Sequence, residues 1–270
     1  MRPEAIWIFV VFVGFALLEL LRGSFFHKKN QTSADIWVEL IGTPVLLVIT
    51  QPLILLASYL LMAQAFPQAA GSWAVLPILA QIALLIVFDD MMQYWWHRAS
   101  HSFTWLYNLH RAHHSGEYMS VRIVYRNNVF YYLTMPSLWF SGALIYLGLG
   151  PVFVPYVMVK QLVIIAAHSD VPWDRPLYRI KWLSPIMWLV ECTISTPSTH
   201  SAHHGKHKAD GVTNYKGNFG NLLFFWDVLF GTAKITRKYP PEIGVENLPP
   251  ITAAEQLAWP IFRSEASRVT

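Results

Sequence analysis

The chain has 270 residues, of which 54% are hydrophobic and only 13% are charged, and its net charge is +4. This composition excludes an ordinary soluble globule and indicates an integral membrane protein. A basic face beside anionic lipid explains the positive charge, so we expect no nucleic acid partner. The single cysteine, Cys192, excludes both a disulfide framework and a thiolate metal site.

Long apolar segments recur along the chain, and most approach the length of about 20 residues that a membrane-spanning helix needs. We expect spans near residues 5–21, 36–65, 73–94, 129–149 and 151–167. We interpret the first as a retained span and not a signal peptide, because no small-residue cleavage site follows it. Glu19 lies inside it, and we expect this carboxylate near the interface or against another helix.

The basic residues indicate how these spans are oriented. They follow the first, third and fifth spans, whereas the turns at 66–72 and 148–151 carry no charge. By the positive-inside rule, the N-terminus lies outside and residues 95–122 and 168–270 form a cytoplasmic part.

The cytoplasmic part is polar and rich in aromatic residues. Within it, the pattern predicts helices over 182–195 and 252–259 and a loop over 206–220. No linker or low-complexity tract interrupts the chain, so we expect residues 1–270 to form one domain. The predicted fold is an all-α membrane bundle of about four to five transmembrane helices, capped by a helical, histidine-rich cytoplasmic part that holds two metals.

Three short histidine clusters follow apolar segments: HRASH at 97–101, HRAHH at 110–114 and HSAHH at 200–204. Residues three or four apart on a helix share one face, and imidazole is a common ligand of transition metals. A structural role would explain any one histidine, but not eight in three spaced sets. The expected ligands are His97, His101, His110, His113, His114, His200, His203 and His204. One tetrahedral ion takes only four ligands, so two metals are implied.

The other three histidines stand outside the clusters. His168 follows the fifth span, at the depth of the clusters, and we expect it to be a ninth ligand. His207 lies in a lysine-rich loop, where we expect it to be solvated, and His27 is expected at the membrane interface.

Carboxylates behind the ligands are expected to orient the histidine rings, since metal-bound histidines commonly donate their second N–H to such a group. Asp90 lies seven residues before His97, on the same helix face, whereas Asp89 points elsewhere. Glu191 and Asp227 are further candidates for this role.

The segments DDMMQYWWHRASH, LHRAHHS, the isolated His168, STPSTHSAHHG and NFGNLLFFWDVLFGT together resemble the fatty acid hydroxylase/sterol desaturase superfamily, over about residues 85–232. This resemblance implies an integral-membrane, non-haem di-iron oxygenase. The nine histidines would bind two iron ions, and O2 with supplied electrons would oxidise a C–H bond of a membrane lipid such as a sterol, a fatty acyl chain or an ether lipid. Asp90 falls where the family often has an aspartate before its first histidine box.

Two features qualify the resemblance. After the third cluster, Asn218-Phe219-Gly220 aligns with the family's Asn-Tyr-Gly, but the aspartate expected two residues earlier is missing. The sequence contains no fused haem-binding domain, so electrons are expected from a separate protein, either cytochrome b5-like or a ferredoxin with its reductase.

The sequence is compatible with three other functions. Hydroxylation and desaturation begin with the same hydrogen abstraction, and the sequence does not separate them. A histidine-rich metal transporter would place polar ligands in the middle of its spans. A zinc-dependent membrane hydrolase would need fewer histidines and a nearby glutamate base, which the three clusters lack.

Overall fold

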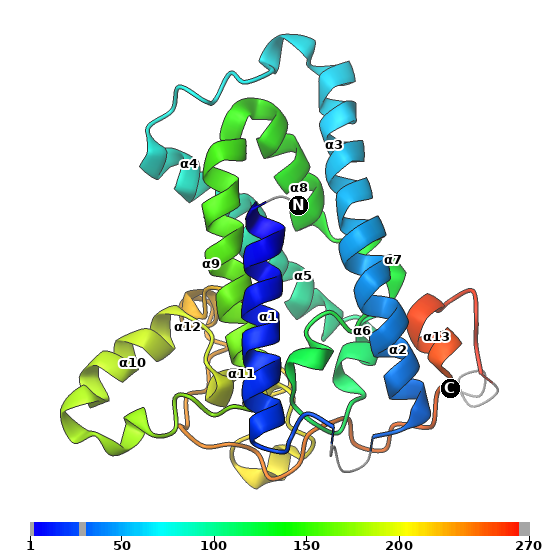
Figure 1. Ribbon diagram of the computed structural model, residues 1–270, viewed down its shortest axis with the longest axis vertical. Coiled ribbons are helices and arrows are strands. Elements are labelled where there is room, and N and C mark those ends of the chain that lie inside the picture. The colour runs from blue at the N-terminus through cyan, green and yellow to red at the C-terminus, as the bar shows by residue number, and fades with distance from the viewer. Residues whose placement is uncertain (1–2, 27–30, 265–270) are drawn as a thin grey trace.

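The computed structural model describes residues 3–26 and 31–264, in which the regular elements are helices and no β-strand occurs. Long helices form one end of the molecule in Figure 1, and shorter helices with their loops gather at the other. The long helices are built from α1 (Pro3–Leu21), α2 (Ser33–Pro44), α3 (Gln51–Ala65), α4 (Ile78–Leu85), α5 (Met92–Ser100), α8 (Pro136–Leu144) and α9 (Gly150–His168).

Three π-helical turns lie next to these helices, and two of them join short helices into a longer one. The turn Val45–Thr50 joins α2 to α3, the turn Ile86–Met91 joins α4 to α5, and the turn Ile145–Leu149 follows α8. Such turns widen the backbone spiral locally and are frequent near functional sites.

Three helices are long and apolar enough to cross a membrane, judged by length and composition: Ser33–Ala65, Ile78–Ser100 and Pro136–His168. The last one reverses at Gly148, whose φ of 109° lies outside the helical region, so the chain turns back between α8 and α9 in Figure 1. Helix α1 is also apolar but shorter. The expected count of four to five crossings therefore stays a prediction.

The surface of the long helices is apolar. Leu79 is 76% exposed and Val48 is 73% exposed. Side chains of this kind are stable in contact with hydrocarbon and unfavourable in contact with water, so this part of the protein suits a bilayer.

The shorter helices surround the histidine clusters. They are α6 (Thr104–His114), α7 (Val129–Leu133), α10 (Ser184–Thr193), α11 (Pro197–His203), α12 (Phe225–Leu229) and α13 (Ala253–Ala258). The helices predicted at 182–195 and 252–259 are confirmed by α10 and α13. The predicted loop at 206–220 contains only one short 3-10 turn, Lys208–Asp210.

Two predicted segment boundaries were wrong. The helix expected at 73–94 runs from 78 to 100, because it starts after Pro77 and continues through the first histidine pair. The single span expected at 129–149 is broken into α7 and α8. Pro136 begins α8, and the residue before a proline is driven out of the helical conformation, as the ψ of 114° at Met135 shows.

Buried charged groups hold the shorter elements to the long helices. Glu19 is fully buried at the end of α1, where its carboxylate accepts hydrogen bonds from the Ser120 hydroxyl at 2.6 Å and from the Val121 amide at 3.0 Å. Glu19 was expected near the interface or against another helix, and it contacts the start of the short 3-10 helix Val121–Ile123. Arg126 pairs with Asp35 of α2 in the same way.

Close packing of α3 against α8 depends on Gly142, and this gives a test of the fold. A Cβ atom at Gly142 would lie 2.7 Å from the Leu55 carbonyl oxygen, whereas a Cβ at Gly14 of α1 would meet nothing within 4 Å. We predict that Gly142→Ala lowers the free energy of unfolding by about 1–3 kcal/mol, because the helices must separate. Thermal unfolding in detergent micelles measures this.

Gly14→Ala is the matched control, and it should leave stability unchanged or raise it by at most about 1 kcal/mol, because alanine favours helix. Equal unfolding midpoints for the two variants would contradict this packing of α3 on α8.

Candidate metal centre

The first two histidine clusters lie on two helices joined by a tight turn. His97 and His101 lie one turn apart at the end of α5, with ring centres 5.2 Å apart. His110, His113 and His114 occupy the last turns of α6. The expectation that His97 and His101 are neighbours is therefore confirmed.

The third cluster lies on α11, which begins where the sequence suggests. The Thr196 hydroxyl accepts a hydrogen bond from the Thr199 amide, and Pro197 occupies the first helical position, where its missing N–H costs nothing. His200 and His203 follow on this helix. His168 is the last residue of α9, and its Nε2 lies 2.8 Å from the Nε2 of His200.

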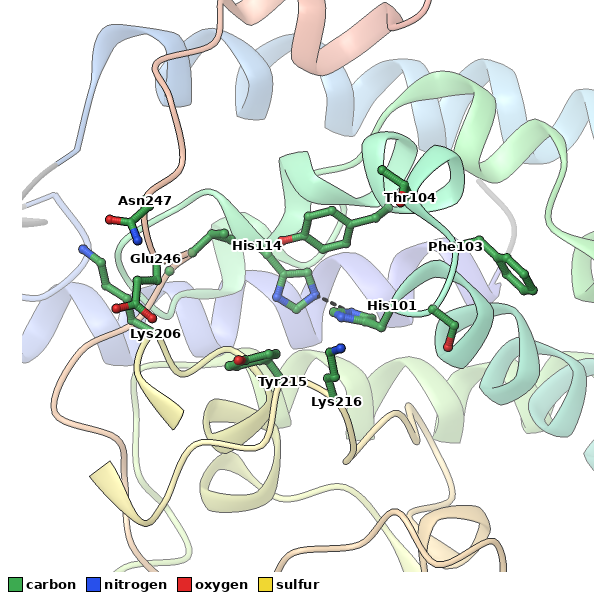
Figure 2. A pocket seen from close by; sticks show the side chains of 13 residues that line it. His101, Phe103, Thr104, His114, Lys206, Tyr215, Lys216, Glu246 and Asn247 are labelled. Carbon is green, nitrogen blue, oxygen red and sulfur yellow. Dashed lines mark hydrogen bonds between the residues drawn. The ribbon is translucent and has the colours of Figure 1, made fainter. Parts of the chain in front are cut away.

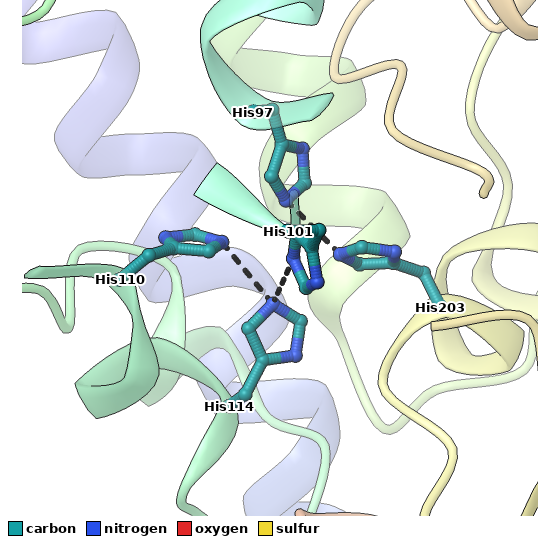
Figure 3. A group of neighbouring side chains, drawn as sticks. All are labelled: His97, His101, His110, His114 and His203. Atoms are coloured by element: carbon teal, nitrogen blue, oxygen red, sulfur yellow. Dashed lines mark hydrogen bonds between the residues drawn. The ribbon is translucent and has the colours of Figure 1, made fainter. Parts of the chain in front are cut away.

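The nine histidines form two groups, and the nitrogens that could bind a metal lie within 4.8 Å of one another in each. The first group is His97, His101, His110, His114 and His203, shown in Figure 3. The second group is His113, His168, His200 and His204. Two of the sequence clusters are therefore divided between the groups. His113 belongs to the second group, although His110 and His114 belong to the first. His203 belongs to the first group, although His200 and His204 belong to the second.

Hydrogen bonds to backbone carbonyls determine which ring nitrogen carries the proton in the first group. The Nδ1 of His97 lies 2.7 Å from the Phe219 oxygen, and the Nδ1 of His203 lies 2.8 Å from the Gly217 oxygen. A carbonyl oxygen can only accept, so both Nδ1 atoms donate and each neutral ring keeps a lone pair on Nε2. Those two Nε2 atoms lie 3.0 Å apart with no proton between them.

The second group contains the same arrangement. His113 donates from Nδ1 to the Ile123 oxygen, and His168 donates from Nδ1 to the Ile164 oxygen. Their Nε2 atoms lie 3.3 Å apart. In each group, therefore, two lone pairs face each other across a distance at which they repel unless a cation lies between them.

The spacing of these nitrogens fits one ion in each group. Nitrogens about 2.1 Å from a metal ion lie about 3.0 Å apart when they subtend a right angle and about 3.4 Å apart at the tetrahedral angle. The observed 3.0 Å and 3.3 Å fall in this range. The facing pair of nitrogens in each group therefore has the spacing of two ligands of one transition metal ion.

Burial keeps these rings neutral. Desolvation, followed by the charge of the neighbouring rings, holds the pKa of His110, His114 and His204 well below its usual range. The pKa of His203 is lowered by the same burial. The lowered pKa means that these rings do not gain a second proton at neutral pH. The repulsion between the facing lone pairs is therefore relieved by a metal ion and not by a proton.

Two of the three carboxylates expected behind the ligands contact the segment that follows the third cluster. Asp227 accepts hydrogen bonds from the amides of Phe219 at 2.9 Å and Gly220 at 2.6 Å, and so holds the peptide whose carbonyl orients His97. Asp90 accepts from the Leu223 amide and from the Trp226 indole.

Glu191, the third expected carboxylate, accepts a hydrogen bond from the guanidinium of Arg237 at 2.9 Å.

Backbone oxygens orient the histidine rings in place of the expected carboxylates. The Asn127 side chain does the same for one ring, since its Oδ1 lies 3.1 Å from the Nδ1 of His110. Asn127 was missed because no spacing connects it with the clusters. The carbonyls of Gly217, Phe219 and Ile123 were missed because a backbone oxygen leaves no signal in the sequence.

The remaining predicted residues lie apart from the groups. His207 is partly exposed, and its Nε2 lies 3.4 Å from Glu242, in agreement with the expectation that it is solvated. Asp89 points away from the histidines, as expected, and pairs with Lys160. His27 lies outside the described residues.

Two cavities reach the histidines. The larger, of about 490 Å3, lies beside His101 and His114 and is bordered by Tyr215, Lys216 and Glu246, as Figure 2 shows. The smaller, of about 60 Å3, touches both groups and is lined by His97 and His110 of the first and His113 and His168 of the second. Small molecules can thus approach the groups from two sides.

Comparison with known proteins gives a family match. The model of the fatty acid hydroxylase family matches residues 82–232, a range that contains all nine histidines. No solved structure matches the chain.

Three curated relatives illustrate the similarity. Alkylglycerol monooxygenase of Danio rerio is 31% identical over 53% of this chain and 28% of its own length. Ornithine lipid hydroxylase OlsE of Rhizobium tropici is 28% identical over 69% of this chain and 52% of its own length. Methylsterol monooxygenase 2-1 of Arabidopsis thaliana is 28% identical over 62% of this chain and 60% of its own length. The chain thus covers less than two thirds of each of these relatives.

Because the histidines form two groups, a substitution in one group is predicted to remove the metal ion of that group and leave the other ion bound. His203→Ala removes a donor from the first group, and His113→Ala removes one from the second, so each variant should lose about one metal ion per chain. Elemental analysis of the purified variants measures the metal content, and His207→Ala is the control that should retain all of it. Complete retention of metal in both cluster variants would contradict the assignment.

The loop contacts of Asp227 give a second prediction. Both of its oxygens accept from backbone amides, so Asp227→Asn must turn an NH2 group toward an N–H donor. The Phe219 peptide should shift, and metal affinity should fall by about 10- to 100-fold. Competition with a chelator of known affinity measures this.

Asp90→Asn is the matched control for this prediction. The hydrogen bonds from Leu223 and Trp226 to Asp90 both end on the same oxygen, Oδ2, which an asparagine can replace with its own carbonyl oxygen. Metal affinity should therefore change little. An equal loss in the two variants would show that loss of negative charge, and not displacement of the loop, is responsible.

Proposed function

The chain belongs to the fatty acid hydroxylase family, and from this premise we propose that it is a membrane di-iron oxygenase that hydroxylates a C–H bond of a lipid. The observation that carries the proposal is the pair of histidine groups, in which buried, neutral imidazoles face one another at the spacing of metal ligands.

The proposed ligands divide as the groups do. His97, His101, His110, His114 and His203 would hold one iron ion, and His113, His168, His200 and His204 would hold the other. Imidazole suits zinc, copper, iron and nickel alike, so the choice of iron rests on the family. When bound, the two ions would supply the activation of O2 with electrons from outside, which an oxidation of an unactivated C–H bond requires.

The protein's own residues orient the rings and exclude water. Phe219 packs edge-on against His97 and His203, with ring centres 5.6 Å away in both cases. Tyr131 stacks on His110 at 4.7 Å. These aromatic rings keep bulk water from the imidazoles. The backbone carbonyls that accept from Nδ1 fix the direction of the Nε2 lone pairs, so the site is arranged before any ligand binds.

The lipid substrate is proposed from two observations. The helices that lead to the histidines have apolar exposed surfaces, and the smaller cavity lies between the helices and both groups. The three relatives are named as oxygenases of an alkylglycerol, an ornithine lipid and a methylsterol. Since all three name a monooxygenase or a hydroxylase, we propose hydroxylation, with desaturation as the alternative outcome.

Electrons would come from a separate protein, either cytochrome b5-like or a ferredoxin with its reductase. His101 is the least buried of the ligands proposed for the first iron, and it borders the larger cavity. This is the side from which we expect reduction. The basic residues that follow the spans in sequence support a cytoplasmic location for it and an outside N-terminus.

The alternative functions fit less well. A metal transporter needs ligands along the middle of its spans, whereas the histidine groups lie at the helix ends. A zinc hydrolase needs a base beside its metal, and each group of metal-binding side chains found among the described residues contains histidines only.

Labelled dioxygen tests the proposed function directly. A host that expresses the chain is grown under isotopically labelled O2, and its lipids are analysed by mass spectrometry. We predict lipid species that have gained one labelled oxygen atom and that are missing from the host with an empty vector. Species that have lost two hydrogens and gained no label would indicate desaturation.

The double variant His113→Ala with His203→Ala is the control, because it inserts the same helices but removes a ligand from each group. It should form no labelled lipid. Equal labelling by this variant, or no labelled or desaturated lipid from the wild-type protein, would contradict the proposed function.

A further inference from the structure

The smaller cavity has a polar wall, although it lies among membrane helices. Gln51 of α3, Gln93 of α5 and Gln161 of α9 all line it. These residues belong to the three helices that can cross a membrane, so each of those helices contributes one glutamine to the same cavity. A side-chain amide in such a helix is unfavourable unless it finds a hydrogen-bond partner.

One of these side-chain amides has an oxygen without a hydrogen-bond donor in the part of the chain that the structure describes. The Oε1 of Gln161 accepts a hydrogen bond from the Tyr125 hydroxyl at 2.8 Å. The Oε1 of Gln93, in contrast, is buried and has no hydrogen-bond partner among the described residues. A buried acceptor without a donor is rare in folded proteins, and it points to a group that arrives with a ligand.

The position of Gln93 connects this acceptor with the proposed irons. Gln93 lies four residues before His97, one turn along the same helix face, and both side chains line the cavity. The cavity also touches His113 and His168 of the second group. A group bound by Gln93 would therefore sit within one helical turn of the reacting centre.

The volume limits what can bind. The cavity holds about 60 Å3, and one water molecule needs at least about 10–15 Å3 of such space. A few small groups fit, but an alkyl chain does not.

We propose that this cavity receives a hydroxyl or N–H group of the lipid substrate, beside the carbon that is oxidised, and that Gln93 positions the substrate by accepting a hydrogen bond from it. The inference rests on the proposed function and narrows the substrate class to lipids that carry a hydrogen-bond donor next to the reacting carbon. A plain hydrocarbon segment would leave the amides unpaired.

The substrate is identified first, as the lipid that yields the labelled product in membranes that contain the wild-type protein under labelled dioxygen. If no labelled lipid forms, the proposed function fails and the inference fails with it. If the substrate, before oxidation, has no hydroxyl or N–H group on the carbon that becomes labelled or on the next carbon, the inference fails while the proposed function stands.

The second step compares the native lipid with an analogue in which hydrogen replaces the hydroxyl, or an ester replaces the amide. We predict that the wild-type protein prefers the native lipid by about tenfold in kcat/KM, the effect of one hydrogen bond. In Gln93→Met, which keeps the length of the side chain and removes the amide, this ratio should fall close to one, and oxidation should spread to neighbouring carbons. Because it is a ratio, it does not depend on the amount of folded protein.

Gln81→Met is the matched control. Gln81 lies in the same long helix, but its amide donates to the carbonyls of Ala74 and Leu76, away from the cavity. This variant should keep the wild-type ratio, and both variants should keep the wild-type metal content. A wild-type ratio and wild-type products in Gln93→Met would overturn the inference.

Discussion

Repulsion between facing lone pairs is the constraint on which this structure depends. His97 and His203 in one group, and His113 and His168 in the other, each donate from Nδ1 to a backbone carbonyl and present Nε2 to a partner that does the same. Burial keeps the rings outside the membrane segments neutral, so protons do not relieve the repulsion. Packing nine imidazoles together is therefore unfavourable unless metal ions bind, and the surrounding fold must hold the rings in place against it.

Buried charged groups supply much of that restraint. Asp227 holds the loop that orients His97, and Glu19 connects α1 to the segment just after His168 and to the loop at 120–121. Arg111, which lies between two ligands on α6, pairs with Glu255 of α13, so a helix near the end of the described chain supports the second cluster. Breaking such a pair is costly because it leaves an uncompensated buried charge. These buried pairs thus hold the segments around the site in place.

Much of this arrangement could be predicted from the sequence, because histidine spacing and apolar length are local properties. The helical class, α10, α13 and the proximity of His97 to His101 all follow from patterns within a few residues. Other features depend on contacts between distant segments. No local pattern assigns His113 to one group and His114 to the other, or identifies Asn127, Phe219 and Gly217 as the partners of the rings. The break before Pro136 was missed because the hydrophobic pattern continues across it.

X-ray absorption spectroscopy at the iron edge, on the purified protein in detergent, tests the central claim most directly. The account predicts iron surrounded mainly by imidazole nitrogens at about 2.1 Å, with the outer-shell scattering that imidazole rings give. A spectrum dominated by oxygen or sulfur neighbours, or a protein that binds no iron when it is supplied, would contradict the claim that these histidines form a two-metal site.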